Sequence, residues 1–426
     1  MKQITTLDGA SAALEAYWPN TRDKKFRMTL EHMKDLMDYL GNPQDSFKAV
    51  HVAGTSGKTS TAYYIAALLQ ASGKKVGLTV SPHVDYLNER VQIGLEPLPE
   101  AMFIKEMNEF MALIEESPLE PTYFDLIYAF PFWVFARQKV EYAVIEVGLG
   151  GLLDNTNVMT RSDKVCVLTD IGYDHMSVLG NTLPEIAEQK AGIILLRNAV
   201  FCWEQSKEVM DVFRRVARQK QADLHTLSKP VEGDELAALP LFQVRNFNLA
   251  LEVASYITKR DGLPDLTERD VARAAATHIP ARMEICKKGS KTIIIDGAHN
   301  AQKLHALMQS VQEKFPGKPI ATLVAFARTS TPEGRIEDSM PEIIEPSAFI
   351  IATQFIIDRD IPHPSTDPQM ITAVCKNAGY TSCQAVADAK EAFAALLKRP
   401  EPILVVTGSF FLLNTIRPLL GLKRPL

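Results

Sequence analysis

The stretch from His51 to Thr61, HVAGTSGKTST, lies between an apolar, β-rich run at 47–53 and a run with helical spacing at 59–71. The pattern predicts a strand, a glycine turn and a helix. Gly54 and Gly57 allow tight turns that present backbone N–H groups without an obstructing Cβ atom. The start of the helix adds the positive end of its dipole, so the stretch has the features of a phosphate-binding loop.

The polar side chains of this loop suit a nucleoside triphosphate. Lys58 would contact the outer phosphates as a point charge, and Thr59 or Ser60 offers a hydroxyl to the magnesium ion that accompanies ATP. The loop does not match the longer GxxxxGK[ST] pattern, because position 52 is Val. A structural turn that merely contains Gly-Lys is the alternative. The predicted ATP-binding residues of the loop are Gly54, Thr55, Ser56, Gly57, Lys58, Thr59 and Ser60.

The composition indicates an ordinary globular protein. The 426 residues are 46% hydrophobic and 23% charged, and a chain of this length favours two domains. The net charge of −5 argues against a broad nucleic-acid-binding surface. The longest apolar run, 126–136, is too short to cross a membrane, and we expect no secretion signal at the start. Scattered cysteines without a CxxC pair are typical of reduced thiols in a cytoplasmic protein.

Two further polar positions follow or interrupt predicted strands. Ser81 follows the run 75–80, at a carboxyl end where open α/β sheets bind ligands. Glu146 is the one acid in the apolar strand 142–147. A buried carboxylate is costly unless it is paired or binds a metal, so Glu146 is a candidate magnesium ligand. A hydrogen-bonded structural Glu is the alternative.

Predicted strands and helices alternate along most of the chain, which indicates mostly parallel sheets with helices on both faces. We expect an α/β protein with a P-loop-containing N-terminal domain at 1–279, braced by N-terminal helices. A smaller, Rossmann-like C-terminal α/β domain is expected at 280–426. Two residues carry weak signals alone: His175 would more often be a core or surface histidine, and Lys190 a surface lysine.

Several motifs occur in order along the chain: LGNP at 40–43, HVAGTSGKTS at 51–60, SPH and NERVQIG within 81–94, EVGLGGLLDNTNV at 146–158, DIGYDHMSVLGNTLPEIAEQKAGII at 170–194, PARME at 280–284, DGAHN at 296–300 and VTGSF at 406–410. Together they resemble the folylpolyglutamate synthase and dihydrofolate synthase family, within the Mur ligase superfamily of ATP-dependent amide-bond-forming enzymes. The resemblance covers most of the chain.

The resemblance implies roles for the N-terminal motifs. Lys58 would contact the ATP phosphates, with Thr59 beside them, and Ser81, Glu146 and His175 would be magnesium ligands. Lys190 corresponds to a lysine that is carbamylated in relatives, and such an anion would suit a second magnesium site.

The resemblance also implies roles around the second domain. Asn246 corresponds to an adenine-contacting position, while Arg282 and Asp296 resemble a pair that reaches the phosphates and ribose. His299 lies in the DGAHN motif, which faces the cleft. The predicted catalytic residues are Lys58, Lys190 and His299, and the predicted metal ligands are Ser81, Glu146, His175 and Thr59.

The chain departs from the family pattern at several positions. Ser56 and Thr59 replace Asn and Gly of the usual phosphate loop, and Leu152 stands where Arg is usual. Phe242 replaces a His, and Ala281 replaces the Gly of PGR. These departures bear on the identity of the substrate more than on the ATP chemistry.

We therefore expect an ATP-dependent ligase that adds L-glutamate to a folate or to dihydropteroate through an acyl phosphate. Its cofactors would be ATP and Mg²⁺, and its partners small molecules rather than nucleic acid or membrane. A cytoplasmic monomer is expected, since family members are commonly monomers. The alternatives are a Mur-type ligase with another acid substrate and a catalytically inactive nucleotide-binding regulator.

Overall fold

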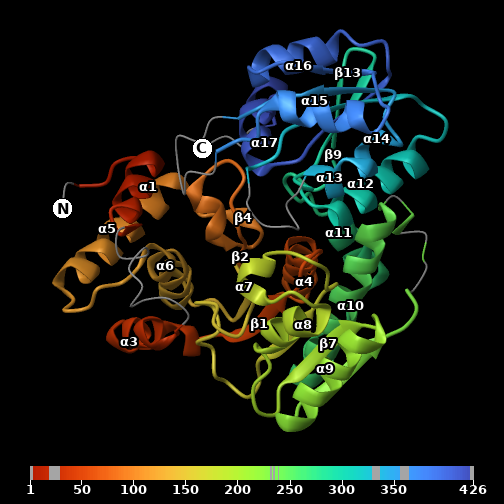
Figure 1. The fold of residues 1–426 in the computed structure, drawn as a ribbon. Helices are drawn as coiled ribbons and strands as arrows, with labels where there is room; N and C mark the ends of the chain where they lie inside the picture. Colours follow the sequence, from red (N-terminus) through yellow and green to blue (C-terminus); the bar gives the residue numbers. More distant parts are fainter. Residues whose placement is uncertain are drawn as a thin grey trace.

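The computed structural model describes residues 3–18, 29–230, 233, 236–237, 239–328, 336–355 and 364–422. These residues form two α/β domains, each built on one sheet, with the C-terminal domain at the top of Figure 1. The two domains meet along an interface that contains a cavity lined by residues of both.

The N-terminal sheet has the strand order β4-β3-β2-β5-β1-β6-β7-β8. All neighbours from β2 to β8 pair in parallel, whereas β3 and β4 form an antiparallel extension at one edge. Its strands are β1 (Lys48–Ala53), β2 (Val76–Thr79), β3 (Gln92–Ile93), β4 (Glu96–Pro97), β5 (Tyr142–Glu146), β6 (Val165–Leu168), β7 (Ala199–Trp203) and β8 (Asp223–Leu227).

Helices cover both faces of this sheet because successive side chains of a strand point to opposite faces. Ala49 of β1 belongs to one buried apolar cluster and Val50 to another. The side of Ala49 and Ala53 carries α1 (Leu7–Glu15), α3 (Glu31–Tyr39), α5 (Glu100–Glu116), α6 (Tyr123–Arg137), α8 (Leu183–Ala191) and α9 (Lys207–Gln219). The side of Val50 carries α4 (Lys58–Ala71), α10 (Leu241–Asp261) and α11 (Glu268–Ala275).

The C-terminal sheet has the order β13-β12-β11-β14-β10-β9, and in it only β9 pairs antiparallel. Its strands are β9 (Glu284–Lys288), β10 (Lys291–Ile295), β11 (Ile320–Val324), β12 (Phe349–Ala352), β13 (Cys383–Ala385) and β14 (Ile403–Thr407). The helices on one face are α12 (Ala301–Lys314), α13 (Ile336–Ser339), α14 (Pro341–Ile344) and α15 (Pro368–Asn377). The other face carries α16 (Ala389–Leu397) and α17 (Phe410–Ile416), and α17 continues into the turn η6 (Arg417–Leu420).

The predicted α/β class with two mostly parallel sheets is confirmed. The sequence analysis did not predict the strand β9, because its residues EICKK are mostly charged and mostly exposed. The proposed boundary at 279/280 lies between α11 and β9. Ala281, next to this boundary, has a φ of +55°, which is the left-handed region where glycine is least strained.

No helix among the described residues combines the length and the hydrophobicity that crossing a membrane requires.

Candidate active site

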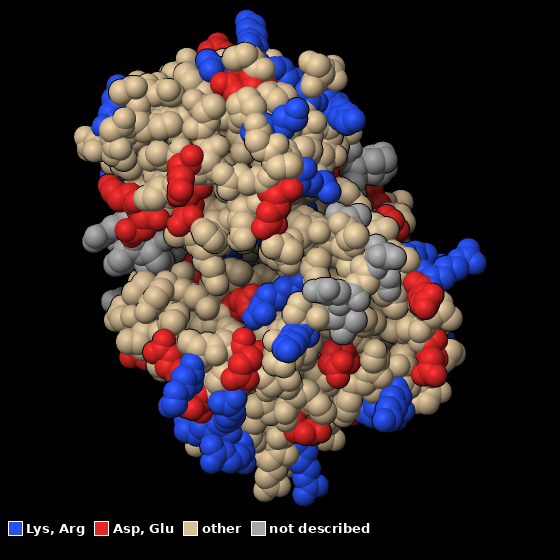
Figure 2. Space-filling model, turned by 90° about the vertical axis from the view of Figure 1, so that its right-hand side faces the viewer, with Lys and Arg blue, Asp and Glu red and all other residues tan. Residues whose placement is uncertain are grey.

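A cavity of about 250 Å³ lies where the carboxyl ends of β1, β2, β5 and β6 face the C-terminal domain. Figure 2 shows a hollow between the two domains, with acidic and basic side chains interspersed over the surrounding face. All the site residues predicted from the sequence line the cavity: Gly54, Thr55, Ser56, Gly57, Lys58, Thr59, Ser60, Ser81, Glu146, His175, Lys190, Asn246, Arg282, Asp296 and His299.

The loop between β1 and α4 is held by hydrogen bonds to the turn that follows the neighbouring strand β6. The backbone N–H of Thr55 donates to the carbonyl oxygen of Asp170 at 2.9 Å, and its hydroxyl donates to that of Gly172 at 3.0 Å. Gly57 precedes α4 with a φ of +87°, and no side chain among the described residues caps the helix. The positive end of the α4 dipole is therefore available to an anion in the cavity.

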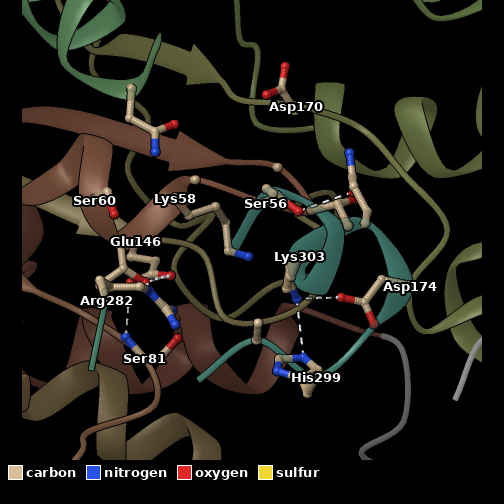
Figure 3. A pocket seen from close by; sticks show the side chains of 18 of the residues that line it. Ser56, Lys58, Ser60, Ser81, Glu146, Asp170, Asp174, Arg282, His299 and Lys303 are labelled. Atoms are coloured by element: carbon tan, nitrogen blue, oxygen red, sulfur yellow. Dashed lines mark hydrogen bonds and ion pairs between the residues drawn. The ribbon is translucent and has the colours of Figure 1, made fainter. Parts of the chain in front are cut away.

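Glu146 ends β5 beside this loop, and its carboxylate is buried (Figure 3). Oε1 accepts the Thr59 hydroxyl at 2.9 Å, and Oε2 accepts the backbone N–H of Ser81 at 3.2 Å. Burial raises the pKa of Glu146, while the positive charges of Lys58 and Arg282 act in the opposite direction. The carboxylate thus joins the ends of two strands to the first turn of α4.

The oxygen atoms gathered here suit magnesium better than a transition metal. Within the described ranges, no group of three or more His, Cys, Asp or Glu side chains could hold a metal ion. Magnesium is usually bound through one or two carboxylates together with water and phosphate oxygens. A buried Glu146 that contacts the Thr59 hydroxyl and the backbone of Ser81 fits that preference. His175 also lines the cavity, and its backbone is in the left-handed conformation with φ +51°.

Lys190 lies beneath the phosphate loop rather than on the surface. Its Nζ atom is buried and donates to the carbonyl oxygen of Gly54 at 2.9 Å. Burial and, to a smaller extent, the nearby charge of Lys58 lower the pKa of Lys190 to about 7. A substantial fraction of this amine is therefore neutral near pH 7, which is the form that reacts with electrophiles.

The C-terminal domain contacts the phosphate loop directly. Arg282 donates from Nη2 to the hydroxyl of Thr59 at 3.2 Å, and the hydroxyl of Ser56 donates to Oε1 of Gln302 at 3.1 Å. Asp296 directly follows β10 and accepts the backbone N–H groups of Met283 and Ala298 at 2.7 and 2.8 Å. These contacts bring the two predicted halves of the site together.

Lys303, on the first turn of α12, joins the two domains beside Asp174 and His299 (Figure 3). Its Nζ atom donates to Oδ2 of Asp174 at 3.1 Å and to Nε2 of His299 at 3.1 Å. The Nδ1 atom of His299 donates to the carbonyl oxygen of Gly297 at 2.8 Å. Burial lowers the pKa of His299 to about 3, and the charge of Lys303 contributes. Both ring nitrogens of this neutral histidine are engaged, so proton transfer by His299 would require Lys303 to move first.

The sequence analysis missed Asp174, Gln302 and Lys303. A lysine near the start of a helix is usually solvated, and Lys303 gave no other signal. Asp174 precedes His175 in a polar turn, which was the one clue to it. Only the packing of α12 against the turn after β6 brings these side chains into the cavity.

The cavity also has an apolar wall that could accept a nucleobase. Asn246 of α10 borders the phosphate loop and donates from Nδ2 to Oε1 of Gln243 at 3.3 Å. Phe242 and Phe410 line the cavity, and the guanidinium of Arg282 lies 4.7 Å from the ring centroid of Phe410. Flat apolar surfaces beside a few polar groups are typical of small-molecule sites.

Both domains match known family models. Residues 52–246 match the Mur ligase middle domain, and residues 281–410 match the Mur ligase glutamate ligase domain. The fold and the cavity are therefore those of an ATP-dependent ligase of the Mur type.

Individual relatives show to which family of Mur-type ligases this chain belongs. It is 33% identical over 431 residues to folylpolyglutamate synthase of Lacticaseibacillus casei, covering 91% of this chain and 94% of the relative. It is 29% identical to dihydrofolate synthetase of Saccharomyces cerevisiae, covering 83% and 87%. Folylpolyglutamate synthase of Mycobacterium tuberculosis, solved with ADP and AMPPCP, has the same fold, with a TM-score of 0.83, 24% identity and coverage of 99% and 100%. The chain belongs to the folylpolyglutamate synthase and dihydrofolate synthase family.

Replacing Gly57 by Ala should weaken ADP binding, because an added Cβ atom would lie 2.4 Å from Oδ1 of Asn246. Gly73 provides a matched control, since its φ of +81° is similar but an added Cβ would meet no described atom within 4 Å. Both variants should lose about 1 kcal/mol of stability from backbone strain. Only Gly57→Ala should raise the Kd for ADP in calorimetry, and equal Kd values for the two variants would contradict the close approach.

The ion pair between Asp174 and Lys303 should make stability depend on acid pH. Burial alone would raise the pKa of Asp174, but the charges of Lys303, His299 and His175 hold it below its usual value. The stabilisation is therefore present above the unfolded pKa of about 3.9 and is lost as pH falls through the folded value.

Melting temperatures measured between pH 7 and pH 3 test this expectation. The wild type should lose thermal stability more steeply below about pH 4 than Asp174→Asn, which cannot titrate. Asp265→Asn, at an exposed position, should follow the wild-type curve. Parallel acid limbs for the wild type and Asp174→Asn would contradict the assigned pKa direction.

Proposed function

We propose that the protein uses ATP to join L-glutamate to the carboxylate of a folate or of dihydropteroate. The observation that carries this proposal is the meeting of four groups at one cavity: the phosphate loop and Glu146 from one domain, and Arg282 and Lys303 from the other. The names of the relatives, folylpolyglutamate synthase and dihydrofolate synthetase, support this pair of acceptors.

A carboxylate is a poor electrophile and needs activation before an amine can attack it. In the proposed reaction, a carboxylate oxygen of the acceptor attacks the γ-phosphorus of ATP, which releases ADP and leaves an acyl phosphate. The glutamate nitrogen then attacks the carbonyl carbon; the C–N bond forms, the C–O bond to phosphate breaks, and the nitrogen loses a proton. Such phosphoryl transfer depends on positioning and on charge neutralisation.

The cationic side chains of the cavity supply part of that neutralisation. Lys58 from the phosphate loop and Arg282 from the C-terminal domain would approach the phosphates from opposite sides. One such charge pair at about 4 Å contributes roughly 4 kcal/mol at an effective dielectric constant near 20. That is too little for several neighbouring phosphate charges, so a divalent cation is also needed.

Thr59, Ser81, Glu146 and His175 would hold magnesium, which neutralises charge on the phosphates and polarises the transferred group. The burial of the Glu146 carboxylate supports this assignment, because the strand end places an acid where only a cation or a proton offsets its charge. Thr59 and Ser81 contact that same carboxylate from two different elements.

The C-terminal domain would complete the nucleotide site. Asp296 with Arg282 would reach the ribose and phosphates, while Asn246 of the N-terminal domain would contact the adenine. Closure of the domain would also exclude water that could hydrolyse the acyl phosphate. Because one chain contributes both halves of the site, we propose that the ligase acts as a monomer. The five free cysteines support a reducing compartment such as the cytoplasm.

A ligase with a different acid acceptor is the second candidate function. Leu152, which replaces an Arg usual in the family, is 40% exposed and packs over Gly192. An apolar side chain there removes a cation that could pair with an acidic acceptor. A different acid could therefore be the preferred acceptor while the phosphate loop is unchanged.

The mass of the product tests the proposal directly. The protein with Mg²⁺, ATP and L-glutamate should extend dihydropteroate, a reduced folate or both by one or more glutamyl units. Glu146→Ala should lower turnover by about 100-fold or more, because it removes the buried carboxylate. No product with either acceptor, from protein that binds ATP and hydrolyses none, would favour the different acid acceptor.

A further prediction concerns Lys190, whose carbamate would suit a second magnesium site. Its neutral amine would attack the carbon of CO₂, form an N–C bond and release a proton, which gives a carbamate anion. The pKa of about 7 means that the neutral amine increases as pH rises through 7, so carbamate formation at fixed dissolved CO₂ should be greater at pH 8 than at pH 6.

Carbon-13 NMR of protein equilibrated with labelled CO₂ should show a carbamate signal that Lys190→Ala lacks. The variant should lose about 100-fold or more in ligation rate while its Kd for ADP stays near the wild-type value. Ligation at the wild-type rate by Lys190→Ala would remove this lysine from the proposed chemistry.

A further inference from the structure

The loop that follows β2 crosses from the N-terminal domain into the C-terminal one. It begins at Ser81, whose backbone N–H donates to Glu146 in the cavity. Three residues later, the side chain of Val84 is buried within the apolar cluster of β10, β11, β14 and α17 of the C-terminal domain. One end of this short loop therefore belongs to the nucleotide site and the other to the core of the opposite domain.

Asp85, next to Val84, makes a second contact with the C-terminal domain. Its Oδ1 and Oδ2 atoms accept from Nε and Nη2 of Arg417 at 3.3 and 3.2 Å. Arg417 follows α17 near the end of the chain, and its side chain is 0% exposed, against 2% for Asp85. A bidentate pair of this kind fixes the relative orientation of its two partners as well as their distance.

Arg417 has other charged and polar partners besides Asp85. Within its own domain, Arg417 already pairs through Nη1 with Glu284, the first residue of β9. It also donates from Nη2 to the carbonyl oxygen of Leu422 at 3.0 Å. The pair with Glu284 is neutral by itself, so the C-terminal domain does not need the Asp85 carboxylate to compensate the arginine. The bond between Arg417 and Asp85 serves the contact between the domains.

The loop is stiff enough to carry this constraint back to the cavity. The buried carboxylate of Glu89 accepts the backbone N–H groups of three consecutive loop residues, Val84, Asp85 and Tyr86, at 2.8, 2.8 and 2.9 Å. Nε of Arg90 also donates to Nδ1 of His83 at 3.0 Å. Displacement of Asp85 would therefore move the whole turn, including the residues directly after Ser81.

We infer that Arg417 is a positioning residue for the nucleotide site: by holding Asp85, it keeps Ser81 beside Glu146 only while the two domains are docked. This inference rests on the proposed role of Ser81 in the magnesium site. If Arg417 acts in this way, magnesium-dependent nucleotide binding and domain docking are thermodynamically coupled. By linkage, docking strengthens magnesium-dependent binding, and that binding strengthens docking by the same factor.

Asp85→Asn is the sharpest test, because it removes the charge between the domains and leaves the neutral pair of Arg417 with Glu284. The Kd for ADP is measured by calorimetry with and without Mg²⁺. We expect the Kd with Mg²⁺ to rise about tenfold and the Kd without Mg²⁺ to rise less, because Ser81 acts through the metal whereas Arg282 and Asp296 do not. Small-angle scattering of the ligand-free variant should give a larger radius of gyration than that of the wild type.

Arg399→Gln is a matched control. Arg399 makes a similar two-bond pair with Glu401 at 2.8 and 3.1 Å, but both residues lie in the C-terminal domain. This variant should leave both Kd values unchanged. Arg417→Gln should raise the Kd with Mg²⁺, and Arg417→Lys, which keeps the positive charge, should raise it less. The Asp85→Asn, Arg417→Gln double variant should resemble Arg417→Gln alone.

The outcomes separate this inference from the proposed function. A lower melting temperature of Asp85→Asn with an unchanged magnesium dependence would overturn the inference, since the pair would then only stabilise the fold. Wild-type protein that binds ADP without any dependence on Mg²⁺ would instead overturn the proposed metal site itself. A changed magnesium dependence in Arg399→Gln as well would also contradict a specific role for Arg417.

Discussion

The arrangement of the nucleotide site depends on one buried carboxylate. Glu146 ends a strand in the middle of the N-terminal sheet, where burial makes its charge costly and raises its pKa. The chain places the Thr59 hydroxyl and the Ser81 backbone N–H against its two oxygens. These contacts hold the first turn of α4 and the end of β2 beside the same atom pair. Parallel strands make this possible, because their carboxyl ends meet at one edge of the sheet.

The second domain contributes the opposite wall of the cavity. Arg282 and Gln302 contact the phosphate loop and the first turn of α4, and Lys303 contacts Asp174 in the turn after β6. The loop after β2 extends in the other direction and buries Val84 in the C-terminal core. Contacts therefore run both ways across the interface, and the composition of the cavity changes if the domains separate. A ligase that forms a reactive acyl phosphate would benefit from such an arrangement, because a site closed over the intermediate excludes the water that would hydrolyse it.

Much of the fold and of the predicted site follows from local patterns. The glycine turn between strand and helix, the acid within an apolar strand and the alternation of elements predicted the phosphate loop, Glu146 and two parallel sheets. The edge strand β9 was missed because its side chains are mostly polar. Lys303 was missed because a solvated lysine and a buried, paired lysine have the same sequence pattern. Asp174 was missed for the same reason, since its pairing with Lys303 leaves no local sign. His175 and Lys190 were weak signals until the ordered motifs supplied a family resemblance.

The sequence by itself determined where the strands end and which polar groups stand at those ends, because hydrophobic periodicity and glycine positions are local properties of the chain. Only the tertiary structure decided how the two domains meet. The ion pair between Asp85 and Arg417 joins residues 332 positions apart, and neither side chain carries a local sign of its partner. Burial also decided that Lys190 has a pKa of about 7 rather than that of a surface lysine. Desolvation depends on everything packed around a group, so no local pattern records it.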